Sequence, residues 1–303
     1  MKRIALATCL KLPEPDPDAA PLVEELKRRG ADAQWIAWDD PQVNLAAFDL
    51  CVIRSTWNYI HRHRDFLDWA RRAAKKTRLL NPLSVVRWNS DKGYLTELEG
   101  RGIPIVPTLF VERGPVAHLR EMLHPTTWSD VVIKPRVGAA SFATRRFSSR
   151  NFDEGAKFLS EHAARRPMLI QPYLKSVETH GERALVWIDG KFTHAVTKRL
   201  RLETHGEGVS EAQPVSKEEA AFATRVLEPW ASDLLYARVD LARDERGGLV
   251  LMELELIEPS LFLTQSPAAL GRLAAACLKS CRTRPASIRS RGGADPGLPA
   301  DAR

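Results

Sequence analysis

The stretch LMELELIEPSLF, residues 251–262, has the apolar content of a buried β-strand but carries three carboxylates. In a strand, Glu253 and Glu255 lie on one face and Glu258 on the other, because successive side chains alternate. An unpaired buried charge is energetically costly. Any fold of this chain must therefore bring protons, cationic side chains or a metal ion to the face that holds Glu253 and Glu255. The role of Glu258 stays open.

A preceding strand places another carboxylate opposite this face. The segment ARDERGGL, residues 242–249, has the composition of a turn, and a hairpin centred in it pairs Asp240 with Glu253. Like charges that face each other across a ladder destabilise a sheet. Three ways to neutralise them stay open: protonation of one carboxyl group, pairing with Arg238 on the same face, or a divalent cation such as Mg²⁺. A salt-bridged hairpin that faces solvent is the structural alternative.

Strands and helices alternate in the first part of the chain. Strands are predicted at 3–8, 33–38, 49–54 and 78–80, and helices at 19–29 and 62–75. The run 49–54 is continuously apolar, as is typical of parallel sheets. The alternation predicts a small doubly wound α/β domain over residues 1–84.

The rest of the chain follows a different pattern. Strands are predicted at 130–135, 168–174, 183–189, 192–198, 235–243 and 248–257, and helices from about 87 and at 152–163, 216–229 and 267–281. The pair Asp189-Gly190 favours a two-residue hairpin with a type I′ turn. Antiparallel hairpins mixed with helices predict an α+β fold for this part.

Composition excludes several classes of protein. The 303 residues are 44% hydrophobic and contain no apolar run of the ~20 residues that cross a bilayer. The N-terminus is basic and briefly apolar but lacks a cleavage pattern, so we expect a cytoplasmic protein without a membrane partner. The four cysteines lack the spacing of a metal site and are expected to be reduced.

The net charge of +7 is unevenly distributed. Residues 279–303 hold six Lys or Arg and two Asp, a net of +4, which leaves +3 for the rest of the chain. The end of the chain is rich in Gly, Pro and Ala without apolar periodicity, so we predict a disordered basic tail at 283–303. Basic and aromatic residues do not interleave as in RNA-binding segments. We therefore expect no nucleic-acid partner, with a basic RNA-binding protein as the weakest alternative.

Two lysines have both a functional and a structural interpretation. Lys134 ends the apolar strand VVIKP and precedes the small residues of RVGAAS, which let a backbone approach a ligand closely. Lys92 follows NSD, a stretch suited to cap a helix that begins there. Either lysine is also compatible with a position that reaches solvent.

The order of these motifs resembles that of the ATP-grasp superfamily of carboxylate-amine ligases. LLNPLSVVRWNSDK, VVIKP, LIQPYL and ELELIEPS resemble stretches of bacterial glutathione synthetase, and the resemblance covers about residues 1–280. VIRSTWNY, RWNSDK and ELELIEPSLF resemble a narrower group that includes the cyclo-ligase of cycloserine biosynthesis. The resemblance implies an ATP-grasp fold in which the N-terminal α/β domain precedes an ATP-grasp domain at 85–282. Its two α+β subdomains, a lid at about 108–174 and a large subdomain at about 175–282, would enclose the nucleotide.

The same resemblance implies roles for particular residues. Lys92 and Lys134 would contact ATP phosphates, Gln171 and the backbone of Tyr173 and Leu174 the adenine edge, and Glu182 the ribose. The metal ion would be Mg²⁺, with Mn²⁺ as an alternative, and its ligands would be Asp240, Glu253 and Glu255. Arg238 and Lys198 are the catalytic candidates. Arg238 would stabilise charge on the transferred phosphoryl group.

The sequence departs from the family pattern at three positions. Glu255 stands where relatives usually have an Asn ligand. The candidate lid loop RVGAASFATRRF, residues 136–147, has a single glycine, Gly138, where relatives often have several. KRLRLETHGEG, residues 198–208, lacks the Arg-Gly-Asn pattern of glutathione synthetase. This third departure argues against glutathione chemistry and makes Arg201 a candidate for substrate contact.

Further substrate candidates come from the N-terminal domain, because ligands of open α/β sheets lie beyond the carboxyl ends of the strands. These candidates are Thr8, Arg54, Ser55, Thr56 and Trp57, and a structural role is the alternative for Arg54. The resemblance implies a ligase that activates a carboxylate as an acyl phosphate for attack by nitrogen, as in the cyclisation of O-ureido-serine. Its substrate would be small and amino-acid-like, and a homo-oligomer fits the family. The alternative is a non-catalytic ATP-binding regulatory protein on the same fold.

Overall fold

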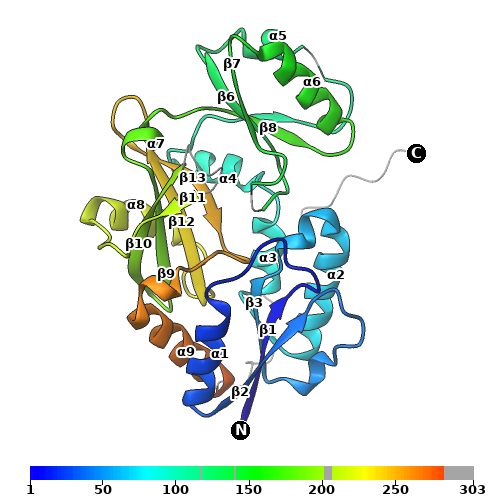
Figure 1. The fold of residues 1–303 in the computed structure, drawn as a ribbon, viewed down its shortest axis with the longest axis vertical. Coiled ribbons are helices and arrows are strands. Elements are labelled where there is room, and N and C mark those ends of the chain that lie inside the picture. The colour runs from blue at the N-terminus through cyan, green and yellow to red at the C-terminus, as the bar shows by residue number, and fades with distance from the viewer. Residues whose placement is uncertain (117, 140, 201–206, 283–303) are drawn as a thin grey trace.

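The computed structural model describes residues 1–116, 118–139, 141–200 and 207–282. Arg201 and the segment 283–303, predicted as a substrate contact and a disordered tail, lie outside the described residues. The described residues form three sheets, here named the N-terminal, central and distal sheets, which follow one another along the long axis of the molecule (Figure 1). None of the helices described is long and apolar enough to cross a membrane.

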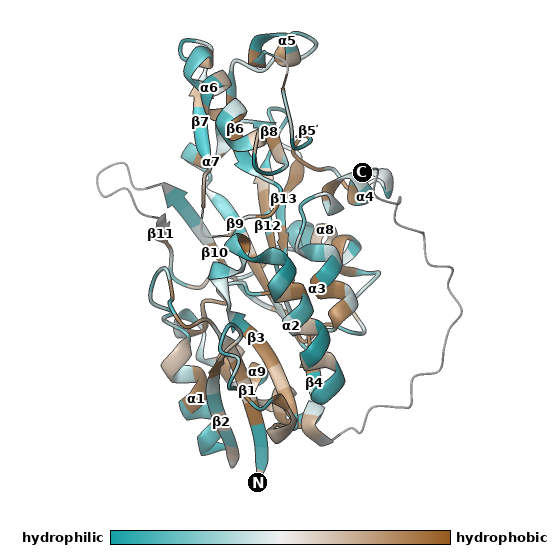
Figure 2. Cartoon of the chain, turned by 90° about the vertical axis from the view of Figure 1, so that its right-hand side faces the viewer, coloured by the Kyte–Doolittle hydropathy of each residue, from teal (hydrophilic) through white to brown (hydrophobic). Residues whose placement is uncertain are grey.

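The N-terminal sheet is parallel and has the strand order β2-β1-β3-β4. Its elements are β1 (Lys2–Thr8), α1 (Ala19–Arg28), β2 (Ala31–Ala37), β3 (Leu50–Ser55), α2 (His63–Lys76) and β4 (Arg78–Leu80), with 3-10 turns at Leu45–Ala47 and Trp57–His61. Ile4 of β1 packs in the core with α1, and the next residue, Ala5, packs in the core with α2. Helices thus cover both faces, and Figure 2 shows β3 as hydrophobic and much of α2 as hydrophilic. The predicted doubly wound architecture is confirmed.

The distal sheet is antiparallel, with the strand order β5-β8-β6-β7. Its elements are β5 (Leu109–Val111), α5 (Leu119–Leu123), β6 (Asp130–Pro135), β7 (Arg145–Ser148), α6 (Phe152–Ala163) and β8 (Met168–Pro172). Helices α5 and α6 cover one face through a core around Phe147 and Leu159. The loop predicted at 136–147 is shorter than expected, because its last three residues belong to β7 and pair with β6.

The central sheet has the order β11-β10-β9-β12-β13. Its elements are α7 (Ser176–Thr179), β9 (Glu182–Ile188), β10 (Lys191–Leu200), β11 (Glu207–Val209), α8 (Lys217–Leu227), β12 (Tyr236–Arg243) and β13 (Leu249–Glu255), followed by a 3-10 turn at Leu263–Gln265 and by α9 (Pro267–Arg282). One face packs on α8 and on α3 (Leu83–Asn89) and α4 (Tyr94–Gly100). On the other face, Val186, Ile188 and Tyr236 belong to the core that contains α9. The remainder of that face carries charged side chains.

Both predicted hairpins are confirmed. In the β12–β13 pair, Asp240 lies opposite Glu253 and Arg238 opposite Glu255. At the tip of the β9–β10 hairpin, Asp189 has a φ of 42° and Gly190 a φ of 89°. A type I′ turn requires positive φ at both central residues.

The helix expected to begin at Lys92 begins two residues later, at Tyr94, and a separate helix, α3, ends before it at Asn89. The amide of Asn89 donates to the carbonyl of Leu254 over 2.8 Å, and its Oδ1 accepts from the N–H of Leu256, also over 2.8 Å. These bonds tie the end of α3 to the end of β13. Lys92 therefore lies in the turn between two helices, next to the charged face of the central sheet.

Candidate active site

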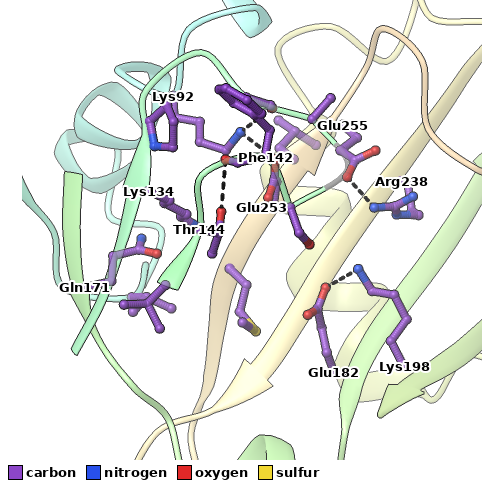
Figure 3. Close-up of a pocket in the computed structure, with 18 of the residues that line it drawn as sticks. Lys92, Lys134, Phe142, Thr144, Gln171, Glu182, Lys198, Arg238, Glu253 and Glu255 are labelled. Atoms are coloured by element: carbon purple, nitrogen blue, oxygen red, sulfur yellow. Dashed lines mark hydrogen bonds and ion pairs between the residues drawn. The ribbon is translucent and has the colours of Figure 1, made fainter. Parts of the chain in front are cut away.

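A cavity of about 360 Å³ lies between the charged face of the central sheet and the distal sheet. In Figure 3, side chains from both sheets converge on it. Most residues that the sequence proposed for nucleotide, metal and catalysis line this cavity: Lys92, Lys134, Gln171, Tyr173, Leu174, Glu182, Lys198, Arg238, Glu253 and Glu255. The cavity thus brings together side chains that are up to 163 positions apart in the chain, from Lys92 to Glu255.

Two lysines bring positive charge to the cavity. Lys92 Nζ lies 2.9 Å from Glu253 Oε1 and donates to the carbonyl of Gly138 over 2.9 Å, while its backbone N–H donates to Arg136. Burial opposes its charge, but the carboxylates around it, Glu253 above all, together raise the pKa of Lys92. The side chain of Lys134, half-buried on β6, has no ion pair or hydrogen bond with any residue that the structure describes. Burial, helped by the nearby positive charge of Lys92, lowers the pKa of Lys134.

A chain of ion pairs crosses the central sheet. Lys198 pairs with Glu182 and lies 3.0 Å from Asp240 Oδ2. Arg238 Nη2 lies 2.8 Å from the same Asp240 oxygen and also pairs with Glu255. Burial works against the charge on Asp240, but Arg238 and Lys198 hold its pKa below the usual range. For Glu255 burial prevails and raises the pKa to about 7. Of the three neutralising arrangements left open by the sequence, pairing with cationic side chains is present in the structure, and the raised pKa of Glu255 also favours its protonation.

The distal-sheet side of the cavity offers backbone and amide groups. Gln171 is 5% exposed and its Nε2 donates to Thr108 Oγ1 over 2.9 Å. The N–H of Tyr173 donates to the carbonyl of Asp130, so it is not available to a ligand. The N–H of Leu174 has no acceptor among the described residues. A free donor next to a buried amide suits the hydrogen-bonding edge of a planar heterocycle.

Sequence comparison identifies relatives over most of the chain. Residues 4–81 match the family model of the N-terminal domain of D-cycloserine synthetase DcsG. The cycloserine biosynthesis protein DcsG of Streptomyces lavendulae is 33% identical over 281 residues, which cover 86% of this chain and 93% of the relative. The chain belongs to the DcsG family of ATP-grasp ligases.

Solved structures agree with this assignment. The crystal structure of D-cycloserine synthetase DcsG superposes with a TM-score of 0.84 and 30% identity, over 92% of this chain and 100% of that one. D-alanine–D-alanine ligase from Bacillus anthracis, solved with ATP, has a TM-score of 0.68 at 14% identity, over 93% and 97% of the two chains. ATP-grasp ligase PsnB, solved with a minimal precursor, Mg and ADP, has a TM-score of 0.61 at 16% identity, over 92% of this chain and 97% of that one. The two more distant likenesses concern the fold alone, and the predicted ATP-grasp fold is confirmed.

The three metal ligands proposed for this DcsG-family ligase do not converge. Asp240 is 1% exposed, does not line the cavity, and accepts from Arg238 and Lys198 instead. Within the described ranges, no three His, Cys, Asp or Glu side chains are grouped to hold a metal ion. Glu253 and Glu255 do line the cavity, each 27% exposed. Mg²⁺ keeps several waters and takes phosphate oxygens, so one or two carboxylates suffice. These two therefore fit the ion, and Asp240 as a third ligand stays a prediction.

The substrate candidates on β3 lie outside the cavity lining. Arg54, Ser55 and Thr56 are at most 2% exposed and none of them lines the cavity. Arg54 Nη2 donates to the carbonyl of Pro259 over 3.1 Å, and its guanidinium lies 5.3 Å from the ring centroid of Tyr236. These contacts connect the N-terminal sheet to the segment after β13. Arg54 thus has the structural role that was considered as the alternative to substrate binding.

Residues that sequence reasoning did not assign to the site also line the cavity. Tyr59 reaches the cavity from the 3-10 turn, two residues after Trp57, which the sequence did propose and which also lines the cavity. Phe142, in the loop after β6, contacts the ring of His61 edge-on with 4.9 Å between centroids. Glu258 lines the cavity beyond β13. The signal for Glu258 was present in the sequence, since it was the one carboxylate in an apolar stretch for which no partner could be suggested.

Proposed function

We propose that this chain closes a ring in an amino-acid derivative at the expense of ATP. The substrate carboxylate attacks the γ-phosphorus to give an acyl phosphate and ADP, and a nitrogen of the same molecule then displaces phosphate. The kinship to D-cycloserine synthetase DcsG supports this reaction, and O-ureido-serine is the corresponding test substrate. The substrate is therefore a small molecule.

One observation carries the proposal: Lys134 on β6 faces the cavity without an anionic partner among the described residues, while Glu253 and Glu255 face it from the central sheet. A polyanion bound between the two sheets would supply the missing partner. We assign Lys134 and Lys92 to the phosphates, and Gln171 and Leu174 to the adenine. Tyr173 would contact the adenine through its backbone carbonyl only. Glu182 would bind the ribose, and it would then interact with both the ribose and Lys198, its present ion-pair partner.

Glu253 and Glu255 would hold Mg²⁺, or Mn²⁺ in its place, and the ion would neutralise charge on the phosphates and orient them. Arg238, which neighbours both Glu255 and Asp240, is proposed to stabilise the transferred phosphoryl group. Lys198 is the second catalytic candidate and keeps Asp240 ionised from the opposite side. The loop at 136–144 excludes water from the acyl phosphate, because water would otherwise hydrolyse it.

The test is phosphate release from ATP and Mg²⁺, with product identified by mass spectrometry. We expect equal amounts of phosphate and cyclised product with O-ureido-serine, and no sustained release without it. ATP binding without turnover on O-ureido-serine or on a broad set of amino-acid derivatives would overturn the proposal and favour the non-catalytic alternative. Exchange of Mg²⁺ for Mn²⁺ in the same assay tests the metal assignment.

A further inference from the structure

Glu258 is a buried carboxylate at the end of the cavity nearest the N-terminal sheet. It is 9% exposed and lines the cavity three residues beyond the end of β13. Trp57 Nε1 donates to its backbone carbonyl over 3.0 Å, and the hydroxyl of Tyr59 lies near its carboxylate. Both residues belong to the 3-10 turn after β3, so this turn lies directly against Glu258.

Glu258 differs from the other buried or half-buried carboxylates that line the cavity. Each of those has a cation: Glu182 pairs with Lys198, Glu253 with Lys92 and Glu255 with Arg238. Glu258 has no ion pair with any described residue, and the group near its carboxylate is the neutral hydroxyl of Tyr59. A desolvated carboxylate without a cation is unfavourable, and burial accordingly raises the pKa of Glu258 to about 8.

The residues around Glu258 indicate which kind of cation would pair with its carboxylate. Trp57 and Tyr59 also line the cavity, and aromatic rings attract a desolvated ammonium group. Two residues beyond Glu258, the carbonyl of Ser260 accepts from Arg238 Nη1 over 3.3 Å, so a cation suited to a carboxylate lies close by. A cationic group next to an anionic group in one small cavity matches a zwitterion.

We propose that Glu258, flanked by Trp57 and Tyr59, binds the protonated amino group of the substrate. The inference rests on the proposed function, whose substrate is an amino-acid derivative, and it adds the residue that recognises the amine. Glu258 takes no part in the phosphoryl transfer itself. Its contribution is to orient the substrate so that the carboxylate faces the nucleotide and Arg238.

The experiment compares O-ureido-serine with its des-amino analogue, in which hydrogen replaces the amino group. The wild type should prefer the amine substrate roughly 100-fold in kcat/KM, as expected for loss of a hydrogen-bonded buried charge pair. Glu258→Gln keeps the size of the side chain and one carbonyl oxygen but removes the charge. It should lose most of that preference, mainly through KM for the amine substrate, while turnover of the des-amino analogue changes little.

Glu14→Gln is the matched comparison, because Glu14 is an exposed carboxylate that lines the same cavity. If Glu14→Gln abolishes the preference and Glu258→Gln does not, or if Glu258→Gln impairs both substrates equally, the inference is overturned while the proposed function stands. If the wild type turns over neither substrate, the proposed function fails. In that case, calorimetry measures the binding of the two compounds to the protein in the presence of a non-hydrolysable ATP analogue. The role of Glu258 is then judged by the ratio of their dissociation constants in the wild type and in Glu258→Gln.

Discussion

Replacing Glu258 by glutamine removes a buried ionisable group but keeps the shape of the side chain and one carbonyl oxygen. The ordinary pKa of a glutamate is 4.5, and burial, with some help from the charge of Glu255, raises that of Glu258 to about 8. Lys92 and the hydroxyl of Tyr59 act in the opposite direction without cancelling the effect. Between these two pKa values the folded protein holds a proton at Glu258 that the unfolded chain releases. The free energy of unfolding of the ligand-free wild type must therefore fall as the pH rises through this window.

The magnitude follows from the size of the shift. One bound proton corresponds to a slope of about 1.4 kcal/mol per pH unit, so the loss between pH 5 and pH 7.5 amounts to about 3.5 kcal/mol. Glutamine does not ionise, so Glu258→Gln lacks this slope. For a chain of this length, about 3.5 kcal/mol corresponds to a change in Tm of roughly 5 °C. The variant should therefore gain stability over the wild type as the pH rises.

Scanning calorimetry of the ligand-free proteins at pH 5, 6, 7 and 7.5 measures this difference. Glu24→Gln, at an exposed position of α1, removes one carboxylate without removing a buried one and is the control for net charge. The Tm of Glu258→Gln minus that of the wild type should widen steadily with pH, whereas Glu24→Gln should follow the wild type. Parallel pH profiles for all three proteins would refute the claim that Glu258 is buried without a cation.

Three further predictions concern other parts of the fold. Lys134→Ala should reduce ATP turnover at least 100-fold with an unchanged circular dichroism spectrum, while Lys157→Ala on the exposed face of α6 should keep wild-type kinetics. Glu253→Gln should weaken Mg-ATP turnover by orders of magnitude and raise the Mg²⁺ concentration needed for half-maximal rate; an unchanged Mg²⁺ titration would remove it from the metal site. Arg54→Met should lower the free energy of unfolding by about 2 kcal/mol, measured in urea, because the carbonyl of Pro259 loses its buried donor, and KM should stay unchanged if Arg54 does not touch substrate.

The hairpin that carries the acidic face could be predicted because its determinants are local. A turn of the composition found at 242–249 fixes which residues of the two strands pair, and the two-residue period of a strand then places Asp240 and Glu253 on the same face. The same holds for Asp189 and Gly190, whose positive φ values follow from the turn type. In both cases fewer than twenty residues of sequence contain the whole argument.

The helix break before Lys92 could not be predicted, because it depends on contacts far away in the chain. The side chain of Asn89 bonds to the backbone of Leu254 and Leu256, more than 160 residues further along. Nothing in the local sequence announces those partners. The assignment of Arg54 to the substrate had the same weakness. A strand-end arginine is suited to a carboxylate, and only the folded chain brings the carbonyl of Pro259 within its reach.

The acidic strand that constrains the fold also determines how charges are distributed in the cavity. Most of its buried charges are balanced within the protein, as in the series Glu182, Lys198, Asp240 and Arg238. Such balance stabilises the folded protein but leaves these charges few free contacts for a ligand. Lys134 and Glu258 are different, because each faces the cavity without an oppositely charged partner among the described residues. A bound polyphosphate would pair with Lys134, and an ammonium group would pair with Glu258. Since Lys134 lies on the distal sheet and Glu258 beside the N-terminal sheet, the proposed binding would orient nucleotide and amino acid in one direction, with Arg238 between them on the central sheet.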